Sequence, residues 1–263
     1  MQVTLLQIDI AWCDAGQNRT VIENMMSGAA KSDLYVLPEM FTTGFDVTPR
    51  ASVEASEGET LQWMRKMAAS YDAAVAGSVA IQSEDGSMRN RLYFVKPDGT
   101  YQYYDKRHLF TYGGEDKAYT RGANRVIVEW RNVRFLLQIC YDLRFPVFAR
   151  NGINKTNASL PQYDCCIYVA NWPSSRRSVW DTLLHARALE NQCYVLGVNR
   201  VGDDAVCHYD GGTVVIDAYG KDLAVAPDSN VAIVTAELDI DRLSSFRKKF
   251  PVLYDADHYT INN

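Results

Sequence analysis

Short apolar runs separated by polar turns recur along the chain and predict a series of β-strands. Two of these runs, LYVL at 34–37 and IYVA at 167–170, are continuously apolar, which indicates strands that are covered on both faces. The turn sequence KPDGT at 96–100 separates two neighbouring strands. The predicted strands span residues 2–9, 33–38, 73–81, 90–96, 101–104, 125–130, 133–139, 164–170, 193–199, 213–217 and 231–237.

Between the strands, four segments show the apolar spacing of amphipathic helices, with apolar residues every three or four positions. These segments span residues 18–30, 59–70, 176–191 and 239–249. No linker, repeat or low-complexity tract separates two halves of the chain. We therefore expect one α/β domain over residues 1–263. Periodicity alone leaves open whether it contains one large sheet or two packed sheets.

Composition and charge narrow the class of protein. The 27 Lys and Arg residues against 32 Asp and Glu residues give a net charge of −5, which argues against a nucleic-acid partner. The apolar runs are too short to span a membrane, and the N-terminal MQVTLLQIDIAW is typical of a core strand and not of a secretion signal. The chain has only six cysteines, mostly in apolar segments, which favours free thiols over disulfides. Free thiols are typical of a reducing compartment, so we expect a cytoplasmic location.

Two segments place a charged side chain where a predicted strand ends. In VLPEMF at 36–41, an apolar strand leads into Glu39, which either faces a crevice or lies in a solvated turn. In YYDKRHLF at 103–110, Lys106 lies among aromatic residues. It is either a fixed cation in apolar surroundings or a solvated lysine at a strand end.

A third segment, FLLQICYDLRFP at 135–146, delivers Cys140 from a buried strand to a turn. Pro146 suits the first turn of a helix, and the dipole of a following helix favours the thiolate form of a cysteine. This arrangement is typical of acyl-transfer enzymes, although a buried structural cysteine is the alternative. The chain contains no phosphate-binding loop, dinucleotide fingerprint, zinc-ligand spacing or serine nucleophile elbow.

Taken together, LPEMF at 37–41, YDKRHLF at 104–110 and ICYDLRFP at 139–146 resemble the three signature blocks of the nitrilase (carbon–nitrogen hydrolase) superfamily, in the same order. YVANWP at 168–173 and WDTLLHARALENQ at 180–192 extend the resemblance over nearly the whole chain. The resemblance implies a four-layer α-β-β-α sandwich.

The resemblance also implies a catalytic set of Glu39, Lys106 and Cys140, with Glu115 as an auxiliary acid. Cys140 would attack an amide carbon while Glu39 removes the thiol proton. The Lys106 ammonium and the backbone N–H of Tyr141 would hold the resulting oxyanion. The resemblance implies no metal and no cofactor, and it implies self-association as a homodimer or a larger homo-oligomer.

Within the superfamily the likeness is greatest to bacterial omega-amidases, which hydrolyse the terminal amide of dicarboxylic acid monoamides such as 2-oxoglutaramate and succinamate. The distal carboxylate of such a substrate needs a cation, for which Arg176 and Arg177 are candidates unless both are solvated. Candidate residues for other substrate contacts, each aromatic being equally consistent with plain core, are Phe41, Phe110, Asn171 and Trp172.

The three signature blocks do not separate the reactions of the superfamily. A nitrilase, an N-carbamoyl hydrolase or another aliphatic amidase would carry the same Glu, Lys and Cys. A non-catalytic binding protein on the same fold is a further alternative, against which the intact set of three residues argues.

Overall fold

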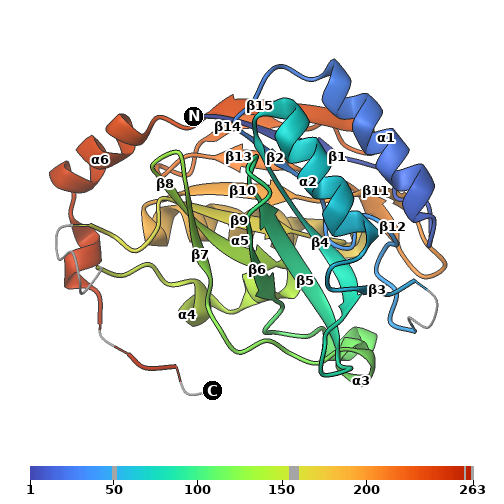
Figure 1. Cartoon of the computed structure of the whole chain (residues 1–263). Helices are drawn as coiled ribbons and strands as arrows, with labels where there is room; N and C mark the ends of the chain where they lie inside the picture. Colours follow the sequence, from blue (N-terminus) through green and yellow to red (C-terminus); the bar gives the residue numbers. More distant parts are fainter. Residues whose placement is uncertain (49–51, 154–159, 258, 262–263) are drawn as a thin grey trace.

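Two β-sheets form the centre of the structure, a computed structural model that describes residues 1–48, 52–153, 160–257 and 259–261 (Figure 1). In the first sheet the order is β15-β1-β2-β4-β5-β6, and β3 pairs with β4. Strands β1, β2 and β4 run parallel, and β3 is parallel to β4, whereas β15 is antiparallel to β1 and β5 is antiparallel to β4. The bounds are β1 (Gln2–Gln7), β2 (Leu34–Val36), β3 (Glu54–Ala55), β4 (Ala74–Gln82), β5 (Met88–Val95), β6 (Tyr101–Asp105) and β15 (Ala232–Glu237).

The second sheet has the order β14-β13-β10-β9-β8-β7, with a parallel centre of β8, β9 and β10. A separate ribbon pairs β11 with β12. The bounds are β7 (Ile127–Trp130), β8 (Val133–Ile139), β9 (Cys165–Val169), β10 (Tyr194–Val198), β11 (Val201–Asp203), β12 (His208–Asp210), β13 (Val214–Ile216) and β14 (Asp222–Val225).

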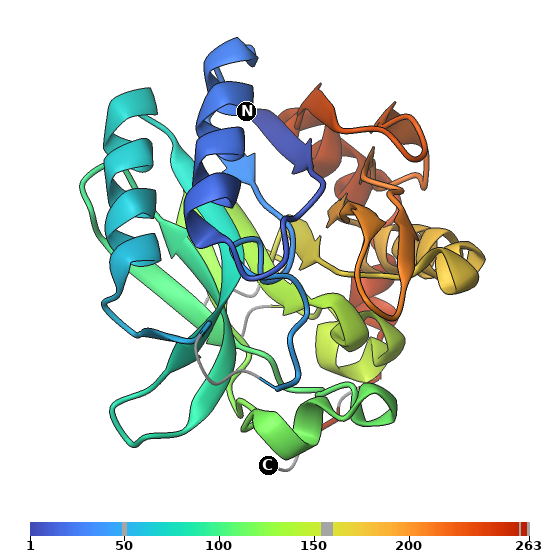
Figure 2. The same cartoon turned by 90° about the vertical axis from the view of Figure 1, so that its right-hand side faces the viewer.

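Helices cover the outer faces of both sheets. Figure 2 shows α1 (Ala15–Gly28) and α2 (Glu59–Tyr71) side by side on one side of the molecule and α5 (Arg177–Asn191) on the other. Helix α6 (Ile240–Lys249) follows β15. The shorter helices are α3 (Glu115–Ala118), α4 (Pro146–Ala149), η1 (Thr111–Gly113), η2 (Cys140–Arg144), η3 (Ser174–Arg176) and η4 (Val252–Asp255). In the described part of the chain, no helix is long and apolar enough to cross a membrane.

Alternation along each strand divides the apolar residues between two cores. In β5, Leu92 and Phe94 face the second sheet and join its residues in one core. Tyr93 and Val95 face the other way and pack with α1 and α2. Both faces of the strand are therefore buried, as the continuous apolar runs predicted. The result is the four-layer α-β-β-α sandwich implied by the resemblance, which the structure confirms.

The predicted strands and helices are all present, with ends that differ by up to three residues. Four strands of two to four residues were not predicted, which are β3, β11, β12 and β14. They were not predicted because a short strand with exposed residues, such as β14, does not show the regular spacing of apolar residues that indicates a strand. Among these, the β11–β12 ribbon matters for function, because its turn borders the cavity described below.

Candidate active site

Glu39 and Cys140 each lie just beyond a buried strand that belongs to a parallel pair, β2 in one sheet and β8 in the other. The chain turns sharply at both places, because Met40 has a φ of 44° and Cys140 a φ of 45°. Residues other than glycine rarely adopt this left-handed conformation, and such strain is concentrated at functional sites. The two turns bring residues from different sheets to one edge of the sandwich.

Lys106, in the loop after β6, joins two carboxylates in the interior. Its Nζ donates to Glu39 Oε1 at 2.8 Å, and to Glu115 at 2.8 Å (Oε2) and 3.0 Å (Oε1). All three side chains are completely buried. Two carboxylates thus share one ammonium group, which leaves the cluster with an excess negative charge when all three groups are ionised.

The pKa values of the cluster follow from burial and from these neighbours. Burial by itself would lower the pKa of Lys106, but the carboxylates of Glu115 and Glu39 reverse this effect and raise it above its ordinary value. Burial raises the pKa of Glu115, which Lys106 opposes and the like charge of Glu39 reinforces. Lys106 therefore remains a cation at neutral pH, and Glu115 is protonated more easily than a free glutamate.

Glu39 is held by donors from three directions. The backbone N–H of Asn171, which follows β9, donates to Oε2 at 2.9 Å. Asn90 on β5 donates to Oε1 at 2.8 Å, beside the bond from Lys106. The side-chain amide of Asn171 also donates to the Glu39 carbonyl oxygen at 2.6 Å. The carboxylate is thereby fixed in place before any substrate arrives.

Cys140 lies beside this cluster, and its Sγ is 4.0 Å from the carbonyl oxygen of Asn171. Burial, followed by the negative charge of Glu39, raises the pKa of the thiol well above its ordinary value of 9.0, and Lys106 only partly offsets the increase. The expectation that a helix dipole favours the thiolate is wrong. The element at this position is the short 3-10 helix η2, not a regular α-helix, and burial raises the pKa of the thiol.

Asp142 ties the turn after β8 to the loop after β6. Its Oδ2 accepts from the Tyr104 hydroxyl at 2.8 Å and from the Ile139 N–H at 2.9 Å. Its Oδ1 accepts from the His108 N–H at 3.1 Å and lies 2.7 Å from His108 Nδ1. The nucleophile turn and the lysine loop are therefore coupled through one buried carboxylate.

A cavity of about 610 Å³ opens above these groups. Cys140, Lys106, Tyr141 and Asn171 line it together with the predicted wall residue Trp172. Phe110 and Arg176, which were also predicted, line it as well. Arg144, Trp12 and the turn between β11 and β12 line it too, and these were not predicted from the sequence. Within this turn Val206 is 89% exposed, which places it at the mouth of the cavity.

Two predicted substrate contacts lie elsewhere. Phe41 is fully buried in the core between the first sheet and its helices, where its ring packs 5.9 Å from that of Trp63. Its alternative interpretation as plain core is the one that the structure shows. Arg177 is paired with Asp181 at 2.8 Å and with Asp228 at 2.9 Å, and it is not among the residues that line the cavity.

Two guanidinium groups remain in the cavity wall. The guanidinium carbon of Arg144 lies 5.3 Å from the centre of the Trp172 ring, and that of Arg176 lies 5.4 Å from the Phe110 ring. Within the residues that the structure describes, neither guanidinium forms an ion pair. Both cations are therefore available to an anion that enters the cavity.

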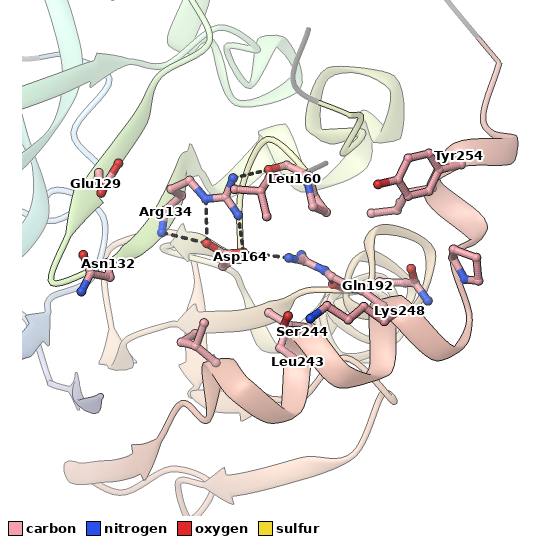
Figure 3. A pocket seen from close by; sticks show the side chains of 15 residues that line it. Glu129, Asn132, Arg134, Leu160, Asp164, Gln192, Leu243, Ser244, Lys248 and Tyr254 are labelled. Carbon is pink, nitrogen blue, oxygen red and sulfur yellow. Dashed lines mark hydrogen bonds and ion pairs between the residues drawn. The ribbon is translucent and has the colours of Figure 1, made fainter. Parts of the chain in front are cut away.

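A second cavity, of about 540 Å³, lies beside α6 at a different place in the fold (Figure 3). Its most buried charges already satisfy one another, because Arg134 and Arg247 both donate to Asp164 Oδ1 at 2.7 Å. Figure 3 shows the Arg134 and Asp164 side chains bonded to each other at the cavity wall. These paired charges stabilise the local structure and leave few charged groups free to bind a ligand.

Among the described residues, no group of three or more His, Cys, Asp or Glu side chains is placed to hold a metal ion. The reactive groups of the site are the Cys140 thiol and the Lys106 ammonium group in the cavity wall, with the buried carboxylates of Glu39 and Glu115 behind them. Such a set can carry out nucleophilic and acid–base chemistry on a carbonyl or nitrile carbon.

Known proteins share this fold. Residues 2–248 match the carbon–nitrogen hydrolase family model. The chain therefore belongs to the carbon–nitrogen hydrolase family, within the nitrilase superfamily.

Two relatives match nearly the whole chain. Omega-amidase YafV of Yersinia enterocolitica is 44% identical over 99% of this chain and 98% of its own length. The 2-oxoglutaramate amidase of Bacillus subtilis is 32% identical over 96% of each chain. The crystal structure of XC1258 from Xanthomonas campestris, a protein of the same superfamily with an arsenic adduct in its active site, superposes with a TM-score of 0.96. It is 40% identical and covers 100% of this chain and 99% of its own.

Proposed function

We propose that this protein is an omega-amidase, which hydrolyses the terminal amide of small dicarboxylic acid monoamides to the acid and ammonia. The observation that carries the proposal is Cys140 in a cavity wall, directly beside the buried cluster of Glu39, Lys106 and Glu115. The similarity to omega-amidase YafV and to a 2-oxoglutaramate amidase supports this choice of substrate.

In the first half of the reaction, Cys140 Sγ attacks the amide carbon and Glu39 takes the thiol proton. A general base is needed because burial and the charge of Glu39 raise the pKa of the thiol well above its ordinary value. The negative charge that develops on the carbonyl oxygen is stabilised by the Lys106 ammonium and by the backbone N–H of Tyr141. One such donor typically contributes about 10²–10³ in rate.

Glu39 then returns the proton to the amide nitrogen, the carbon–nitrogen bond breaks, and ammonia leaves a thioester on Cys140. In the second half, Glu39 takes a proton from water, whose oxygen forms the new bond to the acyl carbon. The carbon–sulfur bond breaks and the sulfur recovers a proton from Glu39. Glu115 orients Lys106 throughout, because both of its oxygens accept hydrogen bonds from Nζ.

The distal carboxylate of the substrate binds Arg176 and Arg144 at the aromatic wall of the cavity. A guanidinium can hold a carboxylate with two parallel hydrogen bonds, and stacking on Phe110 and Trp172 restricts the two groups to this wall. Arg177 has no part in this, because aspartates already pair with it.

The test is ammonia release from succinamate and 2-oxoglutaramate by the wild type and by Cys140→Ala. We expect release by the wild type alone. A nitrile and an N-carbamoyl amino acid, assayed in parallel, report the other reactions of the superfamily. If the wild type acts on one of these and on neither monoamide, the substrate assignment is wrong while the nucleophile stands.

We further propose that the protein acts in the cytoplasm as a homodimer or larger homo-oligomer. Its cysteines are all free, and Cys165, Cys166 and Cys193 are buried, which suits a reducing compartment. Leu189 and Phe250 are 53% and 58% exposed, and this apolar surface near α5 and α6 suits contact with a second copy. A monomer in sedimentation at micromolar concentration would refute the assembly.

A further inference from the structure

Asn90 contacts every charged member of the buried cluster. It lies on β5, is 1% exposed, and its Nδ2 donates to Glu39 Oε1 at 2.8 Å and to Glu115 Oε1 at 3.1 Å. Lys106 Nζ donates to the same two oxygens, at 2.8 and 3.0 Å. The backbone N–H of Lys106 also donates to the Asn90 carbonyl oxygen at 2.9 Å. Two carboxylates are thus bridged twice, once by a cation and once by a neutral amide.

The two ends of the Asn90 amide have different partners. Ionised carboxylates only accept hydrogen bonds, so the Asn90 nitrogen points at Glu39 and Glu115. The oxygen end is held by a hydrogen-bonded chain, in which the Met40 N–H donates to Ser78 Oγ at 2.9 Å and Ser78 Oγ donates to Asn90 Oδ1 at 2.9 Å. Both N–H groups of the amide are then used by the two carboxylates.

The Asn90 amide stabilises the excess negative charge of the cluster. Two buried carboxylates share one ammonium group, and like charges in a buried site favour protonation of one of them. Hydrogen bonds to the ionised form of a carboxylate oppose that protonation, and Asn90 supplies one to each partner without adding charge.

We propose that Asn90, held by Ser78, is a positioning residue that holds Glu39 in place as the general base through its hydrogen bonds to Glu39 and Glu115. This inference rests on the proposed role of Glu39 in the amidase reaction. Asn90 acts through Glu39 and Glu115 and does not itself touch the reacting atoms. The titratable groups that face the pair from the elements around it are Lys106 after β6, Cys140 at the start of η2 and Tyr119 after α3.

The experiment measures the pH dependence of kcat/KM for Asn90→Leu and Ser78→Ala. The substitution removes one hydrogen bond from each carboxylate, which favours the protonated form of the cluster, so the acidic limb of the profile should move to higher pH. We expect a shift of about one pH unit for Asn90→Leu, or about tenfold less activity on the acidic side at a fixed pH. The shift for Ser78→Ala should be smaller, because only the orientation of the amide is released. The fall should lie in kcat with KM nearly unchanged.

Asn151→Leu is the matched control. Asn151 is also fully buried and fully hydrogen-bonded, to Tyr163 and Asn191, but it lies outside the cluster. Its substitution should lower the melting temperature and leave the acidic limb unchanged. If Asn90→Leu does not fold, Ser78→Ala carries the test, because it keeps Asn90 and removes only a hydroxyl group.

A second readout separates this inference from the substrate assignment. The rate at which iodoacetamide alkylates Cys140 should show the same shift of its acidic limb, and alkylation needs no substrate. The wild type could fail to hydrolyse monoamides while the Asn90 and Ser78 variants still show the shifted acidic limb in alkylation. That result would overturn the proposed substrate alone. Folded variants of Asn90 and Ser78 whose acidic limb matches the wild type in both assays would overturn the role of Asn90.

Discussion

The backbone N–H of Asn171 donates to Glu39 Oε2 at 2.9 Å, and the side chain of Asn171 donates to the Glu39 carbonyl oxygen at 2.6 Å. Glu39 follows β2 in one sheet and Asn171 follows β9 in the other. The position of the proposed general base therefore depends on how the two sheets pack, and not only on the loop that carries it.

This relationship predicts a kinetic defect in Asn171→Ala. The substitution removes the side-chain bond and leaves the buried Glu39 carbonyl without that donor, which costs about 1–3 kcal/mol of stability. Displacement of the base should lower kcat by about 10- to 100-fold. Steady-state kinetics and thermal unfolding measure both effects, with exposed Asn24→Ala on α1 as control. An unchanged kcat would contradict the positioning role.

Lys106→Met should damage both stability and activity. It leaves two buried carboxylates without their shared cation, which costs about 3–5 kcal/mol. It also removes an oxyanion donor, so activity should fall by at least about 10²–10³-fold. Thermal unfolding and ammonia release measure the two losses. The exposed Lys117→Met on α3 is the control and should behave like the wild type.

The stability loss of Lys106→Met should depend on pH with a definite sign. Without the ammonium, burial and mutual repulsion raise the pKa of the carboxylates in the folded state. The folded protein then binds more protons than the unfolded chain, so stability falls as pH rises through the raised pKa. The melting-temperature deficit should be smaller at about pH 5 than at about pH 8. A second substitution, Glu115→Gln, should recover part of it, and no recovery would contradict the charge argument.

The Cys140 thiol should remain protonated at neutral pH, because burial and Glu39 raise its pKa well above 9.0. Ultraviolet absorbance of the thiolate, taken as the difference between the wild type and Cys140→Ala, should show no step between about pH 6 and 8. A titration step in that range would mean that a preformed thiolate is the nucleophile and that Glu39 has another role.

Arg144→Gln and Arg176→Gln should raise KM for succinamate and leave the hydrolysis of an uncharged amide such as butyramide unchanged. The reason is that both guanidinium groups face the cavity and are available to the distal carboxylate. Arg177→Gln is the control, since that side chain pairs with Asp181 and Asp228. Equal losses on charged and uncharged amides would contradict carboxylate binding.

Much of the fold could be predicted because apolar periodicity marks the buried strands and helices directly. Continuous runs such as LYVL at 34–37 indicated burial on both faces, which the two cores confirm. Strands such as β11 and β12 could not be found, because three residues with alternating exposure carry no usable period. Their turn borders the cavity, so part of the site was missed with them.

Some of the site residues could be predicted from the sequence and others could not. Glu39, Lys106 and Cys140 stand at strand ends in unusual contexts, which the motif resemblance made specific. Asn90 looks like an ordinary polar residue near the start of a strand. Only its alternation with Leu92 would have placed it between the sheets. Phe41 is the opposite case, because its place two residues after the signature glutamate suggested a substrate contact, whereas the structure packs it in the core.

In the proposed reaction, Cys140 forms a thioester with the acyl part of a dicarboxylic acid monoamide. The most direct measurement is rapid acid quenching of the wild type with succinamate, followed by mass spectrometry of the peptide that contains Cys140. We predict a succinyl group on Cys140 during turnover, which hydroxylamine removes as the hydroxamate, and no adduct in Cys140→Ala. Sustained ammonia release from succinamate by Cys140→Ala at the wild-type rate would contradict the mechanism.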